Sequence, residues 1–220
     1  MTPLTAPVRH QDQSIIVVDK PHGLATAATT DPNQPHLYGQ LCARFPYVGL
    51  HHRLDTPASG LVLFTIDRAA NKSISNGFRH HRITRRYLAV VAGDPGPSGV
   101  WQADIDHKTA TTHFERLSTA DGMSLIEAQL ETGRTHQIRI HAAGAGFPII
   151  GDRRHGGRAG RLWPRLALHA VFLGFSHPRD RSPLRVWAPP PPDLAPLLAP
   201  LLTGQSLDLA RRYSPETEAD

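Results

Sequence analysis

The chain has 220 residues, of which 40% are hydrophobic, and 24 Lys and Arg against 19 Asp and Glu residues give a formal net charge of +5. A chain of this length can bury roughly two thirds of the surface that its unfolded form exposes, which is enough for one well-packed core. No apolar run reaches the roughly 18 residues of a membrane-spanning helix and no secretory signal opens the chain, so we expect a cytoplasmic protein without membrane contact. We also expect a monomer.

The first half of the chain predicts strands around one helix. The β-branched run IIVVDKP at residues 15–21 is typical of a buried strand that ends in a turn. A second buried strand, GLVLFTI, is expected at 60–66. Residues 68–81 lack Pro and favour a helix, and the next strand is expected at 83–93.

The second half predicts more strands and two loops. Short alternating strands are expected at residues 101–106, 109–117 and 124–130. Residues 133–141 alternate polar and apolar side chains with period 2, which predicts a further strand with Ile138 and Ile140 on one face. Turn-rich residues 93–99 and Arg- and Gly-rich residues 153–161 predict loops. The expected fold class is therefore α+β, with a largely antiparallel sheet.

Composition divides the chain into three parts. Residues 1–13 are expected to be an N-terminal extension and residues 14–203 one catalytic domain. A proline-rich stretch from residue 189 is expected to close this domain. The polar residues 204–220 are expected to form a disordered tail.

Basic residues gather in two clusters. The first lies in RHHRITRR and contains Arg79, Arg82, Arg85 and Arg86. The second contains Arg153, Arg154, Arg158, Arg161 and Arg165, with only Asp152 as a counter-charge. Such clusters favour a polyanion as the partner, although solvated surface charge is an equal alternative on composition alone.

Two segments could carry chemistry. In LHHRLDTPASGLVLFT, Asp55 precedes a turn of small residues and a buried strand, so the turn could hold a carboxylate rigidly at the rim of a sheet. Taken alone, this pattern favours a structural ion pair over catalysis. In ETGRTHQIRIH, donors that could grip phosphates are Arg134, His136, Gln137, Arg139 and His141.

A metal site is not expected. Neighbouring histidines such as His51 and His52 point to opposite faces of a strand, and no HExxH or comparable spacing occurs. Cys42 is the only cysteine, which excludes an internal disulfide and zinc sites with two or more thiolates.

Together, these segments resemble the RluA family of RNA pseudouridine synthases. The resemblance rests on IIVVDKPHGLAT, HRLD with TPASGLVLF, ITRRYLAVVAG, TGRTHQIRIH with GFPIIGD, and RLALHAVFLGFSHP, in this order along residues 14–190. It implies the pseudouridine synthase fold, with a long, mainly antiparallel sheet and a central RNA-binding cleft. The related RsuA family typically has Gly where His52 stands, and it lacks the Thr-His-Gln run.

The resemblance also implies residue roles. Asp55 matches the catalytic aspartate, and Arg53 matches an arginine that fills the space of the flipped base. Tyr87 matches a tyrosine that packs against the target base, and Arg134 matches the cation that pairs with the catalytic carboxylate. Further substrate contacts are expected from His52, Gln137, Arg139, Arg82 and Arg85.

The implied reaction isomerises a uridine in structured ribosomal or transfer RNA and needs no cofactor. A family member without an accessory RNA-binding domain would find its RNA with the catalytic domain alone. Two alternatives remain at this point. One is a catalytically silent RNA-binding or ribosome-assembly protein on the same fold, and the other is a histidine-dependent RNA phosphodiesterase.

Overall fold

The computed structural model describes residues 4–202 and 209–213, which form two compact units. Unit 1 contains residues 4–84 and 172–188. Unit 2 contains residues 85–171, 189–202 and 209–213. Both units draw on the single domain expected over residues 14–203, and that boundary stays a prediction.

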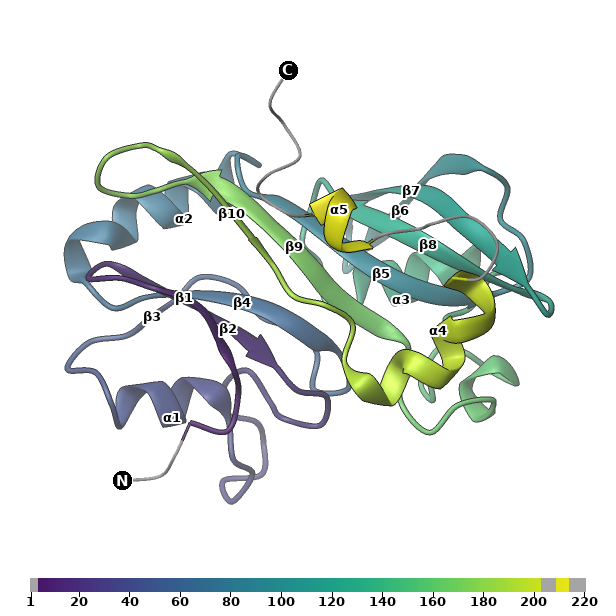
Figure 1. The fold of residues 1–220 in the computed structure, drawn as a ribbon, viewed down its shortest axis with the longest axis horizontal. Coiled ribbons are helices and arrows are strands. Elements are labelled where there is room, and N and C mark those ends of the chain that lie inside the picture. Colours follow the sequence, from purple (N-terminus) through teal and green to yellow (C-terminus); the bar gives the residue numbers. More distant parts are fainter. Residues whose placement is uncertain (1–3, 203–208, 214–220) are drawn as a thin grey trace. The chain divides into compact units, whose positions relative to one another are not determined.

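Unit 1 is built from antiparallel strands and short helices (Figure 1). Its strands are β1 (Val8–Gln11), β2 (Ile15–Lys20), β3 (Gly49–Leu50), β4 (Ser59–Thr65), the end of β9 (Leu168–Ser176) and β10 (Pro183–Trp187). Its helices are α1 (Leu37–Cys42), the 3-10 turn η1 (Arg68–Ala70) and α2 (Asn71–Arg79). β1 pairs with β2, β2 and β3 pair with β4, and β10 pairs with residues 172–176 of β9, all antiparallel.

The core of unit 1 surrounds β4, the strand that follows the candidate catalytic turn. Leu61 and Leu63 point to one face of β4 and Val62 and Phe64 to the other, and all four are fully buried. One buried cluster contains Ile15, Val17, Leu61, Leu63, Ile74, Ile83, Leu173, Phe175, Val186 and Ala188. Because both faces of β4 are covered, its sequence reads as a continuous apolar run rather than an alternating one.

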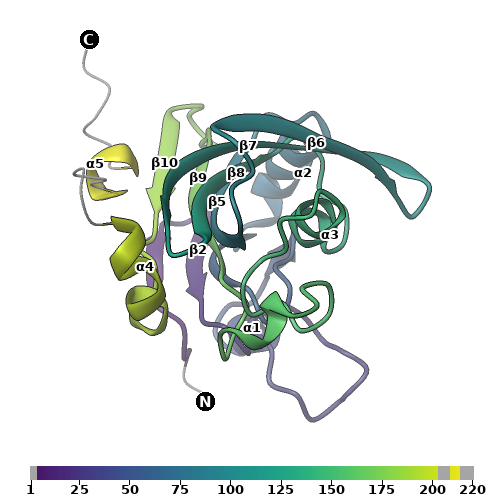
Figure 2. The same ribbon diagram turned by 90° about the vertical axis from the view of Figure 1, so that its right-hand side faces the viewer.

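Unit 2 is an antiparallel sheet with strand order β5–β8–β7–β6. Its strands are β5 (Thr84–Ala92), β6 (Ser98–Ile105), β7 (Lys108–Ala120) and β8 (Met123–Leu130). Its helical elements are α3 (Gln137–Gly144), η2 (Ala159–Arg161), η3 (Pro192–Leu194), α4 (Ala195–Leu202) and α5 (Leu209–Tyr213). Figure 2 shows α3 next to the long hairpin of β6 and β7, which it contacts.

The expected α+β class with a mostly antiparallel sheet is confirmed, and so are the strands expected at 15–21, 60–66, 83–93 and 124–130. The strand expected at 133–141 was wrong, because residues 137–144 form helix α3. The alternation covers only five residues, which is too short to distinguish a strand from a helix. In the helix, Ile138 and Ile140 lie on roughly opposite sides. Ile138 is buried and Ile140 only partly so, and the following residues Ala142 and Ala143 favour a helix.

Both ends of the chain also differ from expectation. Residues 8–11, placed in an N-terminal extension, form β1 and pair with β2. The strand was missed because its side chains are mostly exposed, so its sequence has no apolar alternation. Residues 209–213, placed in a disordered tail, form α5, where Leu209 and Tyr213 are buried. Residues 204–208 and 214–220 of that expected tail lie outside the described residues.

Candidate active site

Asp55 begins a tight turn that leads into β4. The N–H of Ala58 donates to the carbonyl oxygen of Asp55 at 3.0 Å, which closes the turn over residues 55–58, here called the Asp55 turn. The Asp55 side chain is partly buried. A half-buried carboxylate at the start of a rigid strand has the setting expected of a catalytic acid or nucleophile.

A buried lysine holds the Asp55 turn in place. Lys20 at the end of β2 is fully buried. Its Nζ donates to four carbonyl oxygens, at 2.6 Å to Ala58, 2.7 Å to Leu24, 3.0 Å to Pro21 and 3.3 Å to Thr56. Two of these carbonyls belong to the turn and two to the chain after β2, so one ammonium group ties both segments together. Lys20 stands within the motif IIVVDKPHGLAT, and the sequence predicts no role for it.

The residues just before Asp55 are fixed by two side chains. The hydroxyl of Thr26 donates to the Leu54 carbonyl at 2.8 Å and accepts from the Leu54 N–H at 3.1 Å. Nε2 of His52 accepts from the N–H of Leu63 on β4 at 2.9 Å, and its ring stacks on Phe78 with centroids 4.7 Å apart. Thr26, which had no predicted role, therefore positions the residue next to Asp55. His52, expected to contact substrate, has structural contacts here, and its substrate role stays a prediction.

His51, four residues before Asp55, belongs to a polar network. Nε2 of His51 is 2.9 Å from the Thr65 hydroxyl, and Nδ1 is 3.1 Å from the Ser75 hydroxyl. Thr65 in turn donates to Asn71 at 2.5 Å, and Asn71 donates to the hydroxyl of Tyr47. Because Thr65 donates onward, it accepts from His51. Burial lowers the pKa of His51, which favours the neutral ring in this network.

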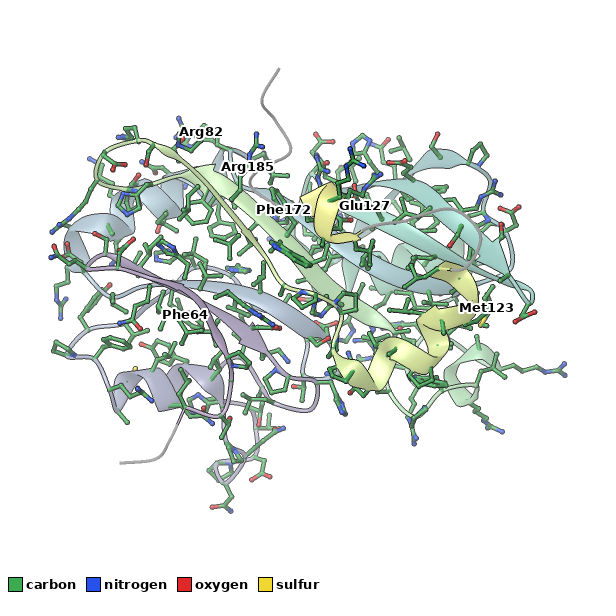
Figure 3. The ribbon with its side chains drawn as sticks, viewed as in Figure 1. Phe64, Arg82, Met123, Glu127, Phe172 and Arg185 are labelled. Atoms are coloured by element: carbon green, nitrogen blue, oxygen red, sulfur yellow. The ribbon has the colours of Figure 1, made fainter. Side chains whose placement is uncertain are left out.

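Two further predicted residues of unit 1 are open to solvent. Arg53 and Arg82 are both exposed. Figure 3 shows the Arg82 side chain pointing away from the ribbon. Both guanidinium groups can therefore reach a ligand in solution, and their roles in substrate binding stay predictions.

Strand β5 of unit 2 carries Tyr87 and Arg85 on one face, two residues apart. Tyr87 is 6% exposed and lies opposite Ala128 of β8. Arg85 is also buried, and its Nη2 donates to the Thr132 carbonyl at 3.1 Å. A Cβ at Gly133 would lie 2.8 Å from Nη1 of Arg85, so glycine at this position leaves room for the guanidinium.

Gln137 organises residues 132–137, here called the Arg134 segment. Its Oε1 accepts from the N–H of Arg134 at 3.0 Å and from the Thr132 hydroxyl at 2.7 Å. Its Nε2 donates to the Thr111 carbonyl at 2.9 Å and to the Thr112 hydroxyl at 3.0 Å. Within the described residues, Nε of Arg134 is buried without a hydrogen-bond partner. Gln137 thus has a structural role, whereas Arg134 keeps a donor that a ligand could use.

Arg139 on α3 forms a buried ion pair with Asp152. Its Nε and Nη2 each donate to a different carboxylate oxygen of Asp152 at 2.8 Å, and both residues are buried. Burial acts to raise the pKa of Asp152, but the hydrogen bonds from Arg139 and from the His155 N–H hold that pKa below its ordinary value. The pair fixes α3 to the chain that follows it, and substrate binding by Arg139 stays a prediction.

The two arginine clusters are not uniform surfaces. In the first, Arg85 is buried and Arg86 lies 3.6 Å from Glu127, which Figure 3 shows close to α5. In the second, Arg165 is buried and pairs with Asp193 at 2.9 Å. Only some members of each cluster are therefore open to solvent, and the buried members have partners inside the protein. A charge pattern in sequence does not distinguish a solvated arginine from one that pairs with a distant acid.

No helix within the described ranges is both long and apolar enough to cross a membrane. Over the same residues, no three or more His, Cys, Asp or Glu side chains are grouped so that they could hold a metal ion.

Residues 14–144 match a family model described as RNA pseudouridylate synthase. The chain is 36% identical over 224 residues to an uncharacterized RNA pseudouridine synthase, YlyB, of Bacillus subtilis, with 89% of this chain and 73% of the relative covered. It is 31% identical over 239 residues to ribosomal large subunit pseudouridine synthase D of Xylella fastidiosa, with 94% and 72% covered.

Among solved structures, human RNA pseudouridylate synthase domain containing 1 is similar, with a TM-score of 0.74, 27% identity and 100% of both chains covered. The expected pseudouridine synthase fold is thereby confirmed. These comparisons favour neither the catalytically silent protein nor the phosphodiesterase.

Proposed function

This chain belongs to the RluA-type family of RNA pseudouridine synthases, and we propose that it acts on a uridine of large-subunit ribosomal RNA with Asp55 as the catalytic carboxylate. The reaction class follows from the family. The choice of ribosomal RNA is supported by relatives named ribosomal large subunit pseudouridine synthase D, from Xylella fastidiosa among others.

The observation that supports Asp55 best is the way its turn is held. Converting uridine to pseudouridine breaks the bond between ribose carbon 1 and uracil N1, turns the uracil, and joins the same ribose carbon to uracil carbon 5. A carboxylate can start this reaction by attacking the ribose, by attacking the uracil, or by abstracting a ribose proton. Each route needs the carboxylate at a fixed place, and the contacts of Lys20 and Thr26 fix the main chain on both sides of it.

Tyr87 and Arg134 are proposed as the other catalytic residues. Tyr87 matches the tyrosine of the family motif, and its ring would pack against the target base. Arg134 matches the cation that serves the catalytic carboxylate, and its buried, unpartnered Nε within the described residues is consistent with a group that completes its hydrogen bonds in the complex with RNA.

A uridine inside structured RNA must leave its stack before the reaction, which costs a few kcal/mol. We propose that Arg53 takes part of the vacated space and that Arg82 contributes a phosphate contact.

We also propose that the enzyme acts as a monomer in the cytoplasm, where ribosomal RNA is available. Size-exclusion chromatography with light scattering would check the monomer, and a mass of two chains would contradict it.

Replacing Asp55 by Asn tests the catalytic assignment. The substitution keeps the shape of the side chain and removes its charge, so we expect turnover to fall roughly 1000-fold or more while RNA affinity changes little. Turnover is measured on an unmodified large-subunit ribosomal RNA transcript by carbodiimide-dependent stops of reverse transcription. The matched control is Asp31→Asn, which makes the same change in an exposed loop. Substantial turnover by Asp55→Asn would exclude Asp55 as the catalytic carboxylate.

The ribosomal substrate is tested separately by mapping pseudouridines in RNA from cells with and without the gene. We expect loss of a defined site in large-subunit ribosomal RNA. A site lost only from transfer RNA would contradict the proposed substrate and leave the reaction class intact.

A further inference from the structure

Four arginines gather on one loop of unit 2 that lies outside the segment matched by the family model. The loop covers residues 153–161, here called the arginine loop, whereas the match ends at residue 144. Its exposed arginines are Arg153, Arg154, Arg158 and Arg161. The family-model match therefore does not include the loop, although the wider resemblance over residues 14–190 spans it.

The positive charge of the arginine loop is not offset locally. Within the described residues, none of its four guanidinium groups forms an ion pair. The nearest acid in sequence is Asp152, whose carboxylate is already bound by the guanidinium of Arg139 and by the N–H groups of Arg154 and His155. The loop thus presents four exposed positive charges without a local counter-charge, which favours binding of an anion.

The loop is also tightly folded. The N–H of Gly156 donates to the Asp152 carbonyl at 2.7 Å, and the N–H of Gly151 donates to the Ala159 carbonyl at 3.0 Å. A Cβ at Gly160 would lie 2.4 Å from the Asp152 carbonyl oxygen, so only glycine allows this close approach. Arginines on a fixed backbone lose less conformational freedom on binding than arginines on a flexible tail.

A histidine pair connects the arginine loop to the Arg134 segment. Nε2 of His155 lies 3.0 Å from Nδ1 of His136, two residues after Arg134. His136 has a left-handed backbone, with φ of 56°, which is uncommon for a residue with a side chain and indicates that the surrounding contacts hold it there. The contact therefore joins the arginine loop to the segment that carries a proposed catalytic residue of the same unit.

We propose that the arginine loop binds phosphate groups of the substrate RNA and so contributes to substrate affinity rather than to the chemical step. This inference rests on the proposed function for the identity of the RNA. Guanidinium groups suit phosphates because their planar donors can bind two oxygens at once. The tie to the Arg134 segment favours RNA over an acidic protein, because phosphates on both sides of a target uridine must be held while it is flipped.

The test is the salt dependence of binding by Arg153→Gln/Arg158→Gln, which removes two charges and keeps polar side chains. With an unmodified large-subunit ribosomal RNA transcript as the probe, we expect the slope of log Kd against log salt to fall by about 1.4 to 1.8, since each lost phosphate contact removes about 0.7 to 0.9. We also expect KM to rise while kcat stays within about twofold of the parent value.

The matched control is Arg44→Gln/Arg181→Gln, which removes two exposed charges from unit 1. Its slope should stay close to that of the parent. An equal fall in both variants would mean that net charge alone matters, and an unchanged slope in the loop variant would exclude phosphate contacts. Either result overturns the proposal.

Two further outcomes distinguish this proposal from a contact with a ribosomal protein and from a failure of the proposed substrate. If the loop variant binds naked RNA normally but assembled ribosomal particles weakly, the loop contacts a ribosomal protein and the proposal is wrong. If the parent enzyme does not modify ribosomal RNA but the slope still falls in the loop variant, the proposed substrate fails and the loop remains a phosphate-binding surface.

Discussion

The segments that carry Asp55 and Arg134 are held in place by different chemistry. The Asp55 turn is held by one buried ammonium, that of Lys20, which binds four main-chain carbonyls. The Arg134 segment is held by the neutral amide of Gln137, which uses both of its polar atoms, and by the ion pair of Arg139 in the following helix. In both segments, side chains outside the reaction fix the backbone from which a proposed catalytic side chain projects.

This difference indicates which single substitutions should lower the free energy of unfolding most. A buried charge whose partner is removed keeps a large desolvation cost, whereas a buried neutral group that loses its partner keeps a smaller one. We therefore expect the largest effect where a buried charge is left unpaired, a smaller one where a charged donor to neutral groups is removed, and a still smaller one where neutral hydrogen bonds alone are lost.

The largest effect is expected from breaking the Arg139–Asp152 pair. Arg139→Ala leaves the buried Asp152 carboxylate without its cation and should lower the free energy of unfolding by about 3–5 kcal/mol, measured by urea denaturation. The double variant Arg139→Met/Asp152→Leu should recover part of this loss, because it removes both charges. Recovery should be incomplete, since Asp152 also accepts from the N–H groups of Arg154 and His155. A double variant less stable than the single one would show that the Asp152 contacts to the loop outweigh the ion pair.

Much of the fold could be predicted from the sequence because apolar runs report burial directly. The strands around residues 15–20 and 59–65 are continuous apolar runs, and they form where expected. Helix α3 could not be recognised, because QIRIH fits two periods and the choice depends on contacts of Gln137 with residues 25 and 26 positions away.

The candidate site also contains residues that the sequence could predict and residues that it could not. Asp55, Tyr87 and Arg134 could be selected because they stand within motifs of a recognisable order. Lys20 and Thr26 could not be assigned a role, since their partners Ala58 and Leu54 are 38 and 28 residues away and are main-chain atoms, which leave no mark on the sequence.

An intermediate loss of stability is expected at Lys20, and comparing it with the loss at Gln137 tests the difference between the two segments. Lys20→Met removes a charged donor from four carbonyls, of which that of Thr56 also accepts from the N–H of Gly23, and should cost about 2–3 kcal/mol of unfolding free energy. Gln137→Leu, which removes only neutral hydrogen bonds, should cost about 1–2 kcal/mol. Both are measured by urea denaturation, with Lys72→Met as an exposed control expected to stay within about 0.5 kcal/mol of the parent. Equal costs at Lys20 and Gln137 would mean that the charge of the anchor is irrelevant.

The Lys20→Met variant also distinguishes a positioning role for Lys20 from a purely structural one. If Lys20 positions the Asp55 turn, kcat of folded Lys20→Met should fall while KM for the RNA transcript changes little. A stability loss with unchanged kcat would restrict Lys20 to a structural role.

The smallest effect is expected at an ionic anchor remote in sequence from both segments, where the charge is partly solvated. Asp12 accepts from the rings of His10 and His177 at 2.9 and 3.0 Å and from the N–H groups of Ser14 and Ile15 at 2.6 and 3.0 Å. Burial acts to raise the pKa of Asp12, but these hydrogen bonds lower it to about 2, against an ordinary value of 3.8. A carboxylate whose pKa is lowered by folding stabilises the folded state at pH values above its ordinary pKa.

That stabilisation should be complete above about pH 4 and should disappear as the pH falls towards about 2, because Asp12 then takes up a proton in the folded state as well. The Asp12 side chain is 31% exposed, so solvent screening limits its contribution to about 1 kcal/mol. Asp12→Asn should therefore be less stable than the parent at pH 6, and the difference should shrink between pH 4 and pH 2, as measured by urea denaturation at each pH. Asp31→Asn, in an exposed loop, should show no such convergence. A constant difference from pH 6 to pH 2 would mean that Asp12 stabilises unit 1 through hydrogen-bond geometry that Asn cannot reproduce, and that its charge contributes nothing.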